Sequence, residues 1–427
     1  MKTLTGYLCL ALLCWSIPAG AVTITDLFTA LREQPLTKLD TIRTREAELK
    51  LQSVHDRFYP ALTGVGSYEV YNSPTNLRPV LPTESARLLA NGEPLPFSDN
   101  IGRVGVRFSL PIFVKELFSL GRQAQILAAG SRVQKRLNLL EHQAVLVAAD
   151  AHLVHMSYLE KALRSRKASL EKTRADVIIK VKNGRIPEVE KVRMDEAINQ
   201  IDLTFNQTWQ QESELKKDIE SLTGIFLDKP VRLTRQGHLR EGELFALKPL
   251  EKNIEAGKFG VQAAKDKLYP SIIGTARWFH NYGEGYNTGA AVDDEYGSYA
   301  LTLQVPLFNK PAYTAIEQAK VALLREQVRF AATRIELQAR AGNLTRTLAL
   351  LGRSMTLGRK SIDHERDLLK VAEVAYAGRR MDQEEYLRYE EKVLTAEANY
   401  YLTEARWWKT FATLAVLYGN NLEELVK

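Results

Sequence analysis

Residues 115–181 form an almost unbroken helix-forming stretch, and no other feature of the sequence constrains the fold as strongly. At a rise of 1.5 Å per residue, one helix over this stretch is roughly 100 Å long. That length is several times the width of a globular core. Its apolar residues step by four and three in alternation, as they do in a coiled-coil seam. The stripe consists of Val133, Leu137, Leu140, Ala144, Val147, Ala151, Val154 and Tyr158.

A short segment with a two-residue period, 102–111, leads directly into this helix. Successive side chains of a strand point to opposite faces, so the segment predicts a strand with one apolar and one polar face. The apolar face would carry Val104, Val106, Phe108 and Leu110, and the polar face Arg103, Gly105, Arg107 and Ser109.

The beginning of the chain has the pattern of a signal peptide at 1–21. Lys2 precedes an apolar run at 7–17, and small residues at 18–21 fit a signal peptidase site. We therefore expect an exported protein whose mature chain begins at Val22. Both cysteines lie in this leader, so disulfides, thiol catalysis and cysteine metal sites are excluded from the mature chain.

The apolar run of the leader is too short to cross a bilayer as a helix. No later stretch reaches the roughly 18 to 20 uncharged residues that a membrane helix needs. Entry into a membrane is therefore expected only as a barrel. The net charge of +7 is spread along the chain. Without a clustered basic arm, nucleic acid is not expected as a partner.

The chain carries one pattern twice: a helix, two strands, a long helix, a tight turn and a return helix. Asp26 is the expected N-cap of the first helix, 25–58, and five prolines in 72–100 predict a long surface loop between the first two strands. The expected bounds are 22–224 for the first repeat (strands at about 60–71 and 101–111, helical hairpin at about 115–223), 225–242 for a linker, and 243–427 for the second repeat (strands at about 270–281 and 297–307, helical hairpin at about 311–420).

Short motifs mark corresponding points of the two repeats. They include the proline that ends the first helix, the exit of the second strand, and the ends of the long and return helices. The pairs are Phe58-Tyr59-Pro60 with Leu268-Tyr269-Pro270, Leu110-Pro111-Ile112-Phe113 with Val305-Pro306-Leu307-Phe308, Asn183-Gly184-Arg185 with Ala377-Gly378-Arg379, and Thr223-Gly224 with Tyr418-Gly419.

The four strands have the length and alternation of transmembrane strands, with aromatic residues crowded at their ends. Four strands cannot close a barrel, because the smallest membrane barrels need about eight. The chain is therefore expected to oligomerise. We expect Arg103, Arg107, Thr302 and Gln304 to line a water-filled lumen, and Val106, Phe108, Leu301 and Leu303 to contact membrane lipid.

The leader, the duplicated order of elements, the strand entries and exits, and the Gly-Arg turns together resemble the TolC family of outer membrane efflux proteins, the outer membrane factors. The resemblance covers nearly the whole mature chain. It implies a mainly α fold with a small membrane β-barrel, in which a homotrimer shares twelve strands and continues as an α-barrel across the periplasm of a Gram-negative cell. It also implies the exit duct of a tripartite efflux or type I secretion system, supplied by a periplasmic adaptor (membrane fusion) protein and an inner membrane pump of the RND or ABC type.

In this family the periplasmic entrance is constricted near the turns of the helical hairpins. The resemblance carries the locking arginine to Arg380 and an acidic position to Glu384. Tyr376 lies beside the position of the gate tyrosine, which is Ala375 here, and Glu190 has the duplicated position in the first repeat. The turns expected to dock the adaptor contain Gly184, Arg185, Gly378 and Arg379.

Other signals do not indicate catalysis or a cofactor. His152 and His155 share a helical face, with His142 earlier, but they lack a carboxylate at ligand spacing and favour a packing or surface role over a metal site. The glycine-rich segment 283–289 lacks the lysine of a phosphate loop and is expected to connect strands. No Gly-x-Ser-x-Gly motif is present, and we expect no enzyme. The alternative function is a periplasmic coiled-coil scaffold or adaptor without a pore.

Overall fold

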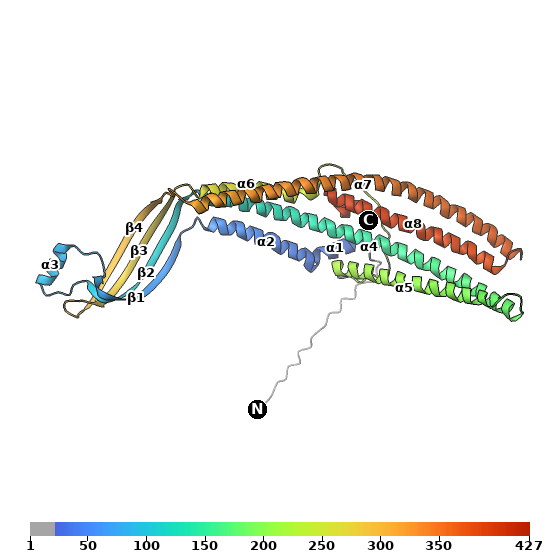
Figure 1. Cartoon of the computed structure of the whole chain (residues 1–427), viewed down its shortest axis with the longest axis horizontal. Helices are drawn as coiled ribbons and strands as arrows, with labels where there is room; N and C mark the ends of the chain where they lie inside the picture. Colours follow the sequence, from blue (N-terminus) through green and yellow to red (C-terminus); the bar gives the residue numbers. More distant parts are fainter. Residues whose placement is uncertain (1–21) are drawn as a thin grey trace, which may run out of the picture. The chain divides into compact units, whose positions relative to one another are not determined.

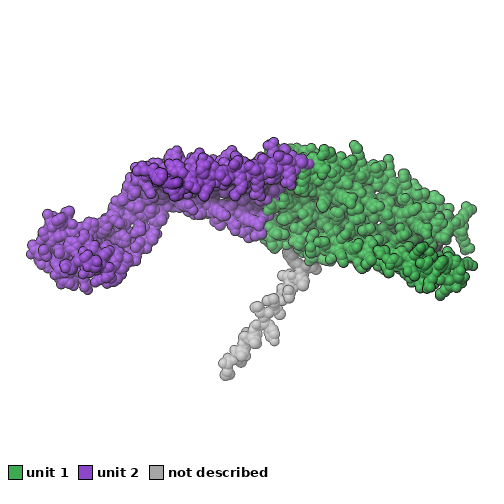
Figure 2. Space-filling view, viewed as in Figure 1, with its two compact units in different colours: residues 1–38, 138–243, 340–427 green, residues 39–137, 244–339 purple. Residues whose placement is uncertain are grey.

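The computed structural model describes residues 22–427, so the expected signal peptide lies outside the described residues. The chain divides into two compact units (Figure 2). Unit 1 contains the described part of 1–38 together with 138–243 and 340–427, and unit 2 contains 39–137 and 244–339. Each unit therefore takes segments from both halves of the sequence.

Unit 2 contains a four-stranded antiparallel sheet in the order β1-β2-β3-β4 (Figure 1). The alternating side chains of each strand suit a two-faced sheet. The pairing of β2 with β3 joins strands from the two halves of the sequence. The strands are β1 (Ala61–Asn76), β2 (Phe97–Val114), β3 (Ser271–Glu284) and β4 (Ala291–Gln304).

The strands extend further toward their connecting loops than expected. β1 continues to Asn76 and β2 begins at Phe97, because the backbone ladder persists beyond the clear hydrophobic alternation. β4 begins at Ala291 and ends at Gln304, before Pro306, which has no N–H to donate to a ladder. The segment 72–100, expected to be a surface loop, contains the helix α3 (Pro82–Ala90), with proline in its first turn.

Two long helical hairpins account for most of the remaining chain. α4 (Lys115–Lys182) turns into α5 (Val189–Thr223), and α7 (Lys310–Ala377) turns into α8 (Gln383–Tyr418). α4 and α7 have 68 residues each. Within residues 22–427, no helix combines the length and the apolar character that crossing a bilayer would require. The expected mainly α fold with a small β part is confirmed, and in the single chain the β part is a four-stranded antiparallel sheet.

Ion pairs join the two arms of each hairpin within unit 1. Lys167 of α4 lies 2.6 Å from Asp202 of α5, and Arg366 of α7 lies 2.6 Å from Glu397 of α8. Each pair includes partly exposed side chains, so each contributes about 1 kcal/mol or less.

The first helix of the chain differs from the expected single helix at 25–58. It is divided into α1 (Ile24–Glu33) and α2 (Pro35–Asp56), because Pro35 lacks an N–H and holds Gln34 in an extended conformation. The N-cap is Thr23, not Asp26. The Thr23 hydroxyl accepts a hydrogen bond from the Asp26 N–H at 3.3 Å, and the Asp26 carboxylate accepts one from the Thr23 N–H at 2.9 Å, which completes a capping box.

The 3-10 helix η1 (Phe245–Leu247) and the helix α6 (Lys248–Asp266) begin the second half of the chain in unit 2. Asp266, at the end of α6, is buried and accepts a hydrogen bond from the Ser119 hydroxyl of α4 at 2.5 Å. The side chain of Gln262 donates a second hydrogen bond to this carboxylate at 2.8 Å. This contact attaches α6 to the beginning of α4.

The main hydrophobic core lies in unit 1. It brings together α1, the middle of α4, the end of α5, the end of α8 and the short helix α9 (Leu422–Leu425). The last residue of the chain pairs with the linker, since the Lys427 N–H donates to the Thr234 carbonyl at 2.9 Å. The fully buried side chains of this core include Leu27, Leu146, Val147, Ile219, Phe411, Ala412, Ala415 and Leu422.

A carboxyl group is buried beside this core. Asp150 of α4 has no exposed surface, and one of its oxygens accepts a hydrogen bond from the Val231 N–H at 2.8 Å. The other oxygen has no hydrogen-bond partner among the residues that the structure describes. Burial raises the pKa of Asp150 to about 7, against a smaller lowering by the Val231 N–H. The fold therefore favours the neutral acid.

We expect the stability of the protein to fall as the pH rises from the ordinary pKa of Asp150, 3.8, to its raised value of about 7. In this interval the folded chain binds a proton that the unfolded chain has lost, so the free energy of unfolding decreases by about 1.4 kcal/mol per pH unit. Asp150→Asn should remove this dependence. Its stability should exceed that of the wild type most above pH 7, and the two should converge toward pH 4.

Denaturant unfolding at a series of pH values measures this effect. Asp176→Asn is the matched control, since Asp176 lies on the same helix but is exposed. Wild type and Asp150→Asn curves that stay parallel across the whole pH range would contradict the assignment of the buried proton to Asp150.

Candidate functional site

In the observed strand register the expected lumen residues, Arg103, Arg107, Thr302 and Gln304, lie on one face of the sheet. Arg107 lies opposite Thr63 of β1 and Arg277 of β3, and Arg277 lies opposite Ser298 of β4. Directly opposite residues share a face, as do alternate residues of one strand. The polar residues of the face defined in this way are Thr63, Arg103, Arg107, Thr275, Arg277, Ser298, Thr302 and Gln304, and the same face also carries Val65, Ile273, Phe279 and Tyr296.

The expected lipid-contacting residues share the opposite face. Leu301 lies opposite Gly274, which lies opposite Leu110 on the other side. Alternation along β2 and β4 then adds the remaining residues. The apolar residues of this face are Leu62, Val104, Val106, Phe108, Leu110, Trp278, Tyr299, Leu301 and Leu303, and toward the connecting loops the same face carries His280 and Glu295.

The apolar face is strongly exposed in the single chain. Tyr299 is 89%, Leu301 71% and Leu303 62% exposed. Contiguous apolar surface of this kind marks a site that another apolar phase or a partner covers. On the polar face, the Arg277 side chain donates a hydrogen bond to the Ser298 hydroxyl at 2.7 Å, so its charge stays within a polar surrounding.

The turn between α4 and α5 closes with two hydrogen bonds. The Gly184 N–H donates to the Val181 carbonyl and the Arg185 N–H to the Lys180 carbonyl, each at 2.9 Å. Gly184 has a positive φ of 65°, which glycine adopts without steric cost. This arrangement satisfies the last carbonyls of α4.

The turn between α7 and α8 has the same two types of hydrogen bond as the turn between α4 and α5. They begin one residue later than the alignment of Gly378 with Gly184 predicts. The Arg379 N–H donates to the Tyr376 carbonyl at 3.0 Å and the Arg380 N–H to the Ala375 carbonyl at 2.8 Å. Arg379, with φ 54°, takes the left-handed position, at a cost of about 1 kcal/mol. The sequence motif aligned Gly378 with Gly184, but the residue with positive φ in the second turn is Arg379, one position later. The motif does not specify which residue of the turn has positive φ.

The acidic residues expected at the entrance begin the return helices. Glu190 is the second residue of α5 and Glu384 the second of α8, where helix dipoles favour negative charge. Each is paired within its own helix, Glu190 with Arg193 at 2.7 Å and Glu384 with Arg388. Among the described residues, no hydrogen bond or ion pair connects either glutamate with Arg380.

Tyr376 stacks on Tyr386, with ring centroids 5.0 Å apart. The pair links the last turn of α7 to the first turn of α8. Burial raises the pKa of Tyr386, with further contributions from Glu390 and Glu373. The structure thus gives Tyr376 a packing partner within its own hairpin, which the sequence did not indicate.

The histidines of α4 lie in unit 1 and differ in burial, since His142 and His152 are half-buried. His155 is buried, and its Nδ1 lies 3.0 Å from the Ala398 carbonyl of α8. Burial lowers the pKa of His155 and of His152, so both favour the neutral ring. Across the part of the chain that the structure describes, no three acidic or histidine side chains are grouped to hold a metal ion.

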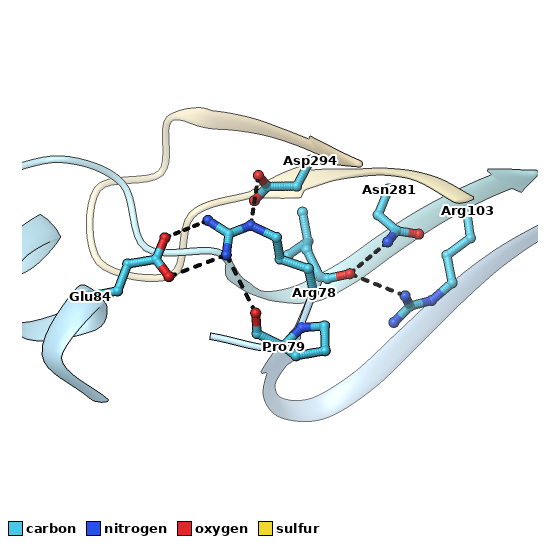
Figure 3. A network of polar contacts seen from close by, with 7 residues as sticks. Arg78, Pro79, Glu84, Arg103, Asn281 and Asp294 are labelled. Carbon is cyan, nitrogen blue, oxygen red and sulfur yellow. Dashed lines mark hydrogen bonds and ion pairs between the residues drawn. The ribbon is translucent and has the colours of Figure 1, made fainter. Parts of the chain in front are cut away.

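Arg78 lies in the connection between β1 and β2. The sequence did not indicate it as a functional residue, because it appears there as an isolated charge in a proline-rich loop. In the fold it lies between Glu84 of α3 and Asp294 of β4 (Figure 3). Asp294 lies opposite Asn281 in the sheet, and Asn281 lies opposite Arg103, so Arg78 reaches the polar face. No local sequence pattern predicts this contact.

No protein-family model and no curated protein sequence matches this chain. Solved structures do match it. The outer membrane protein VceC from Vibrio cholerae is 13% identical with a TM-score of 0.70, over 93% of this chain and 96% of that one.

Two further structures are outer membrane channels. CmeC from Campylobacter jejuni is 16% identical with a TM-score of 0.69, over 92% of this chain and 85% of that one. MtrE from Neisseria gonorrhoeae, in its open state, is 14% identical with a TM-score of 0.69, over 94% of this chain and 90% of that one. At these identities the likeness defines the fold. The chain has the fold of outer membrane channels, in agreement with its resemblance to the outer membrane factors.

Proposed function

We propose that the protein is an outer membrane channel, the passive exit duct of a tripartite efflux or type I secretion system. The observation that carries this proposal is the separation of the sheet into a polar face and an exposed apolar face. A bilayer covers the apolar face and water fills the space along the polar face. Conduction through such a duct needs no catalytic residue.

The sheet supports a trimer. β1 and β4 are its edges, and their outer backbone groups have no ladder partner within the four described strands. Unpaired backbone groups cost several kcal/mol each in lipid, so an open sheet edge is not tolerated there. If β4 of each chain pairs with β1 of the next, three chains close a twelve-stranded barrel without edges.

The helical hairpins form the periplasmic part of this proposal. The turns with Gly184, Arg185, Gly378 and Arg379 dock a periplasmic adaptor, which an inner membrane pump of the RND or ABC type supplies with substrate. Glu190, Glu384, Arg380 and Tyr376 form the entrance. The relatives CmeC and MtrE are described as outer membrane channels, which supports the same location for this chain.

The native mass of the protein, extracted from outer membranes in mild detergent, tests the proposal. We expect a trimer, because only an oligomer closes the sheet. A stable monomer would contradict the channel and would favour the periplasmic scaffold or adaptor, which needs no closed barrel.

Leu301→Arg should destabilise the membrane-inserted protein by about 2 to 4 kcal/mol if Leu301 lies near the bilayer midplane, because it places a charge in lipid. Thr302→Arg is the matched control on the polar face and should cost far less. Urea unfolding from lipid vesicles measures both. A larger cost for Thr302→Arg than for Leu301→Arg would mean that the two faces are reversed.

Glu190→Gln together with Glu384→Gln should lower the preference of the channel for cations, because three copies of each carboxylate ring the entrance. The reversal potential of single channels in a salt gradient measures this preference. Glu196→Gln, farther along α5, is a control outside the first turn. An unchanged reversal potential in the double variant would remove these glutamates from the entrance.

A further inference from the structure

The connection between β1 and β2 folds back over the polar face of the sheet. Leu77, in this connection, is 1% exposed and packs against Ile101 and Val292. Ile101 and Val292 both lie opposite Gly283, one on each side, so they share a face. That face also carries Arg103, two residues after Ile101 in β2. Leu77 therefore covers the polar face at the loop end of the sheet.

The backbone at Leu77 is held by side chains of the sheet. Its carbonyl accepts a hydrogen bond from the Asn281 amide at 2.6 Å and one from the Arg103 guanidinium at 3.4 Å. Arg103 also lies 3.0 Å from Glu69 of β1. Asn281 has no exposed surface, so its side chain has little freedom. Strands β1, β2 and β3 together fix one residue of the connection.

Arg78 fixes the next residue. Its Nε lies 3.0 Å from the Asp294 carboxylate of β4, and its Nη2 lies 2.8 Å from the Glu84 carboxylate of α3. The three side chains are only 23% to 28% exposed. Hydrogen bonds from Arg78 lower the pKa of Glu84. Partly buried, charge-assisted contacts of this kind are stronger than exposed ion pairs.

A second set of contacts ties the end of the connection to the loop between β3 and β4. The Asn287 side chain accepts a hydrogen bond from the Leu95 N–H at 2.8 Å and donates one to the Glu93 carbonyl at 3.0 Å. The Tyr286 N–H donates to the Phe97 carbonyl at 2.9 Å. The connection is thus attached at both ends.

We propose that the Leu77–Arg78 segment is a size filter at the outer end of the duct, held over the polar face by Arg78 and Asp294. This inference rests on the proposed function, in which the polar face lines the lumen. Three copies of the segment then narrow the exit. Because Arg78 and Arg103 are each paired with carboxylates, the filter selects solutes by size more than by charge.

Cysteine labelling in intact cells tests the filter, since residues 22–427 contain no cysteine. Thr302→Cys places a thiol on the polar face, far from the β3–β4 loop. A small charged maleimide and a maleimide on a polyethylene glycol chain are added from outside. We expect the small reagent to label Thr302→Cys readily and the polymer slowly. Adding Arg78→Ala should speed polymer labelling about tenfold, since losing a charge-assisted contact shifts loop opening by roughly an order of magnitude.

The controls separate the filter from a general loosening of the sheet. Arg87→Ala, exposed on α3, should leave the polymer rate unchanged, whereas Asp294→Ala should raise it as Arg78→Ala does. Arg78→Lys keeps the charge but not the two-sided contact, and should give an intermediate rate even if Arg78→Ala fails to assemble. The rate of the small reagent should be the same in all of these variants.

Two results would overturn different parts of this account. If the small reagent labels Thr302→Cys but the polymer rate is the same with and without Arg78→Ala and Asp294→Ala, the filter is wrong and the duct stands. If the small reagent fails to label Thr302→Cys while it labels Leu301→Cys, the polar face does not line an aqueous path, and the proposed function itself fails.

Discussion

The antiparallel pairing of β2 with β3 is the contact on which the sheet depends, because it joins strands from the two halves of the chain. The pairing requires close backbone approach. A Cβ at Gly105 would lie 2.1 Å from the Trp278 carbonyl, and one at Gly102 would lie 2.2 Å from the Tyr282 ring. Gly105 therefore permits a ladder that a larger residue would force apart, whereas a side chain at Gly102 would require the Tyr282 ring to move. Without the ladder, each half would have an isolated hairpin, which is marginal in water.

The same pairing decides the chemistry of both faces. Side chains alternate strictly along a strand, so a shift of one residue between β2 and β3 would mix arginines with leucines on each face. The observed register keeps them apart, with Arg107 opposite Arg277 and Val106 opposite Trp278. A two-faced sheet with long helices attached suits a wall between lipid and water. In our proposal the Leu77–Arg78 segment, which lies in the connection between β1 and β2 and not in the strands of the wall, narrows the exit of the duct.

The helical part is stabilised differently. Its ion pairs between hairpin arms are partly exposed and individually weak. An apolar core packs α1, α4, α5, α8 and α9 together in unit 1. The carboxyl of Asp150 is buried beside that core, and its preference for the neutral form makes the stability of the protein depend on pH.

Periodicity in the sequence determined the fold class, the two faces of the sheet and the long helices, because these follow from patterns of period two and three and a half along one segment. It misplaced the N-cap at Asp26 and the left-handed residue of the second hairpin turn, which is Arg379, because both depend on backbone geometry at a single residue. Only the tertiary structure brought Arg78 to Asp294, 216 residues away, and placed Leu77 over the polar face. Contacts between distant segments depend on how strands pair in space, and no local pattern records that pairing.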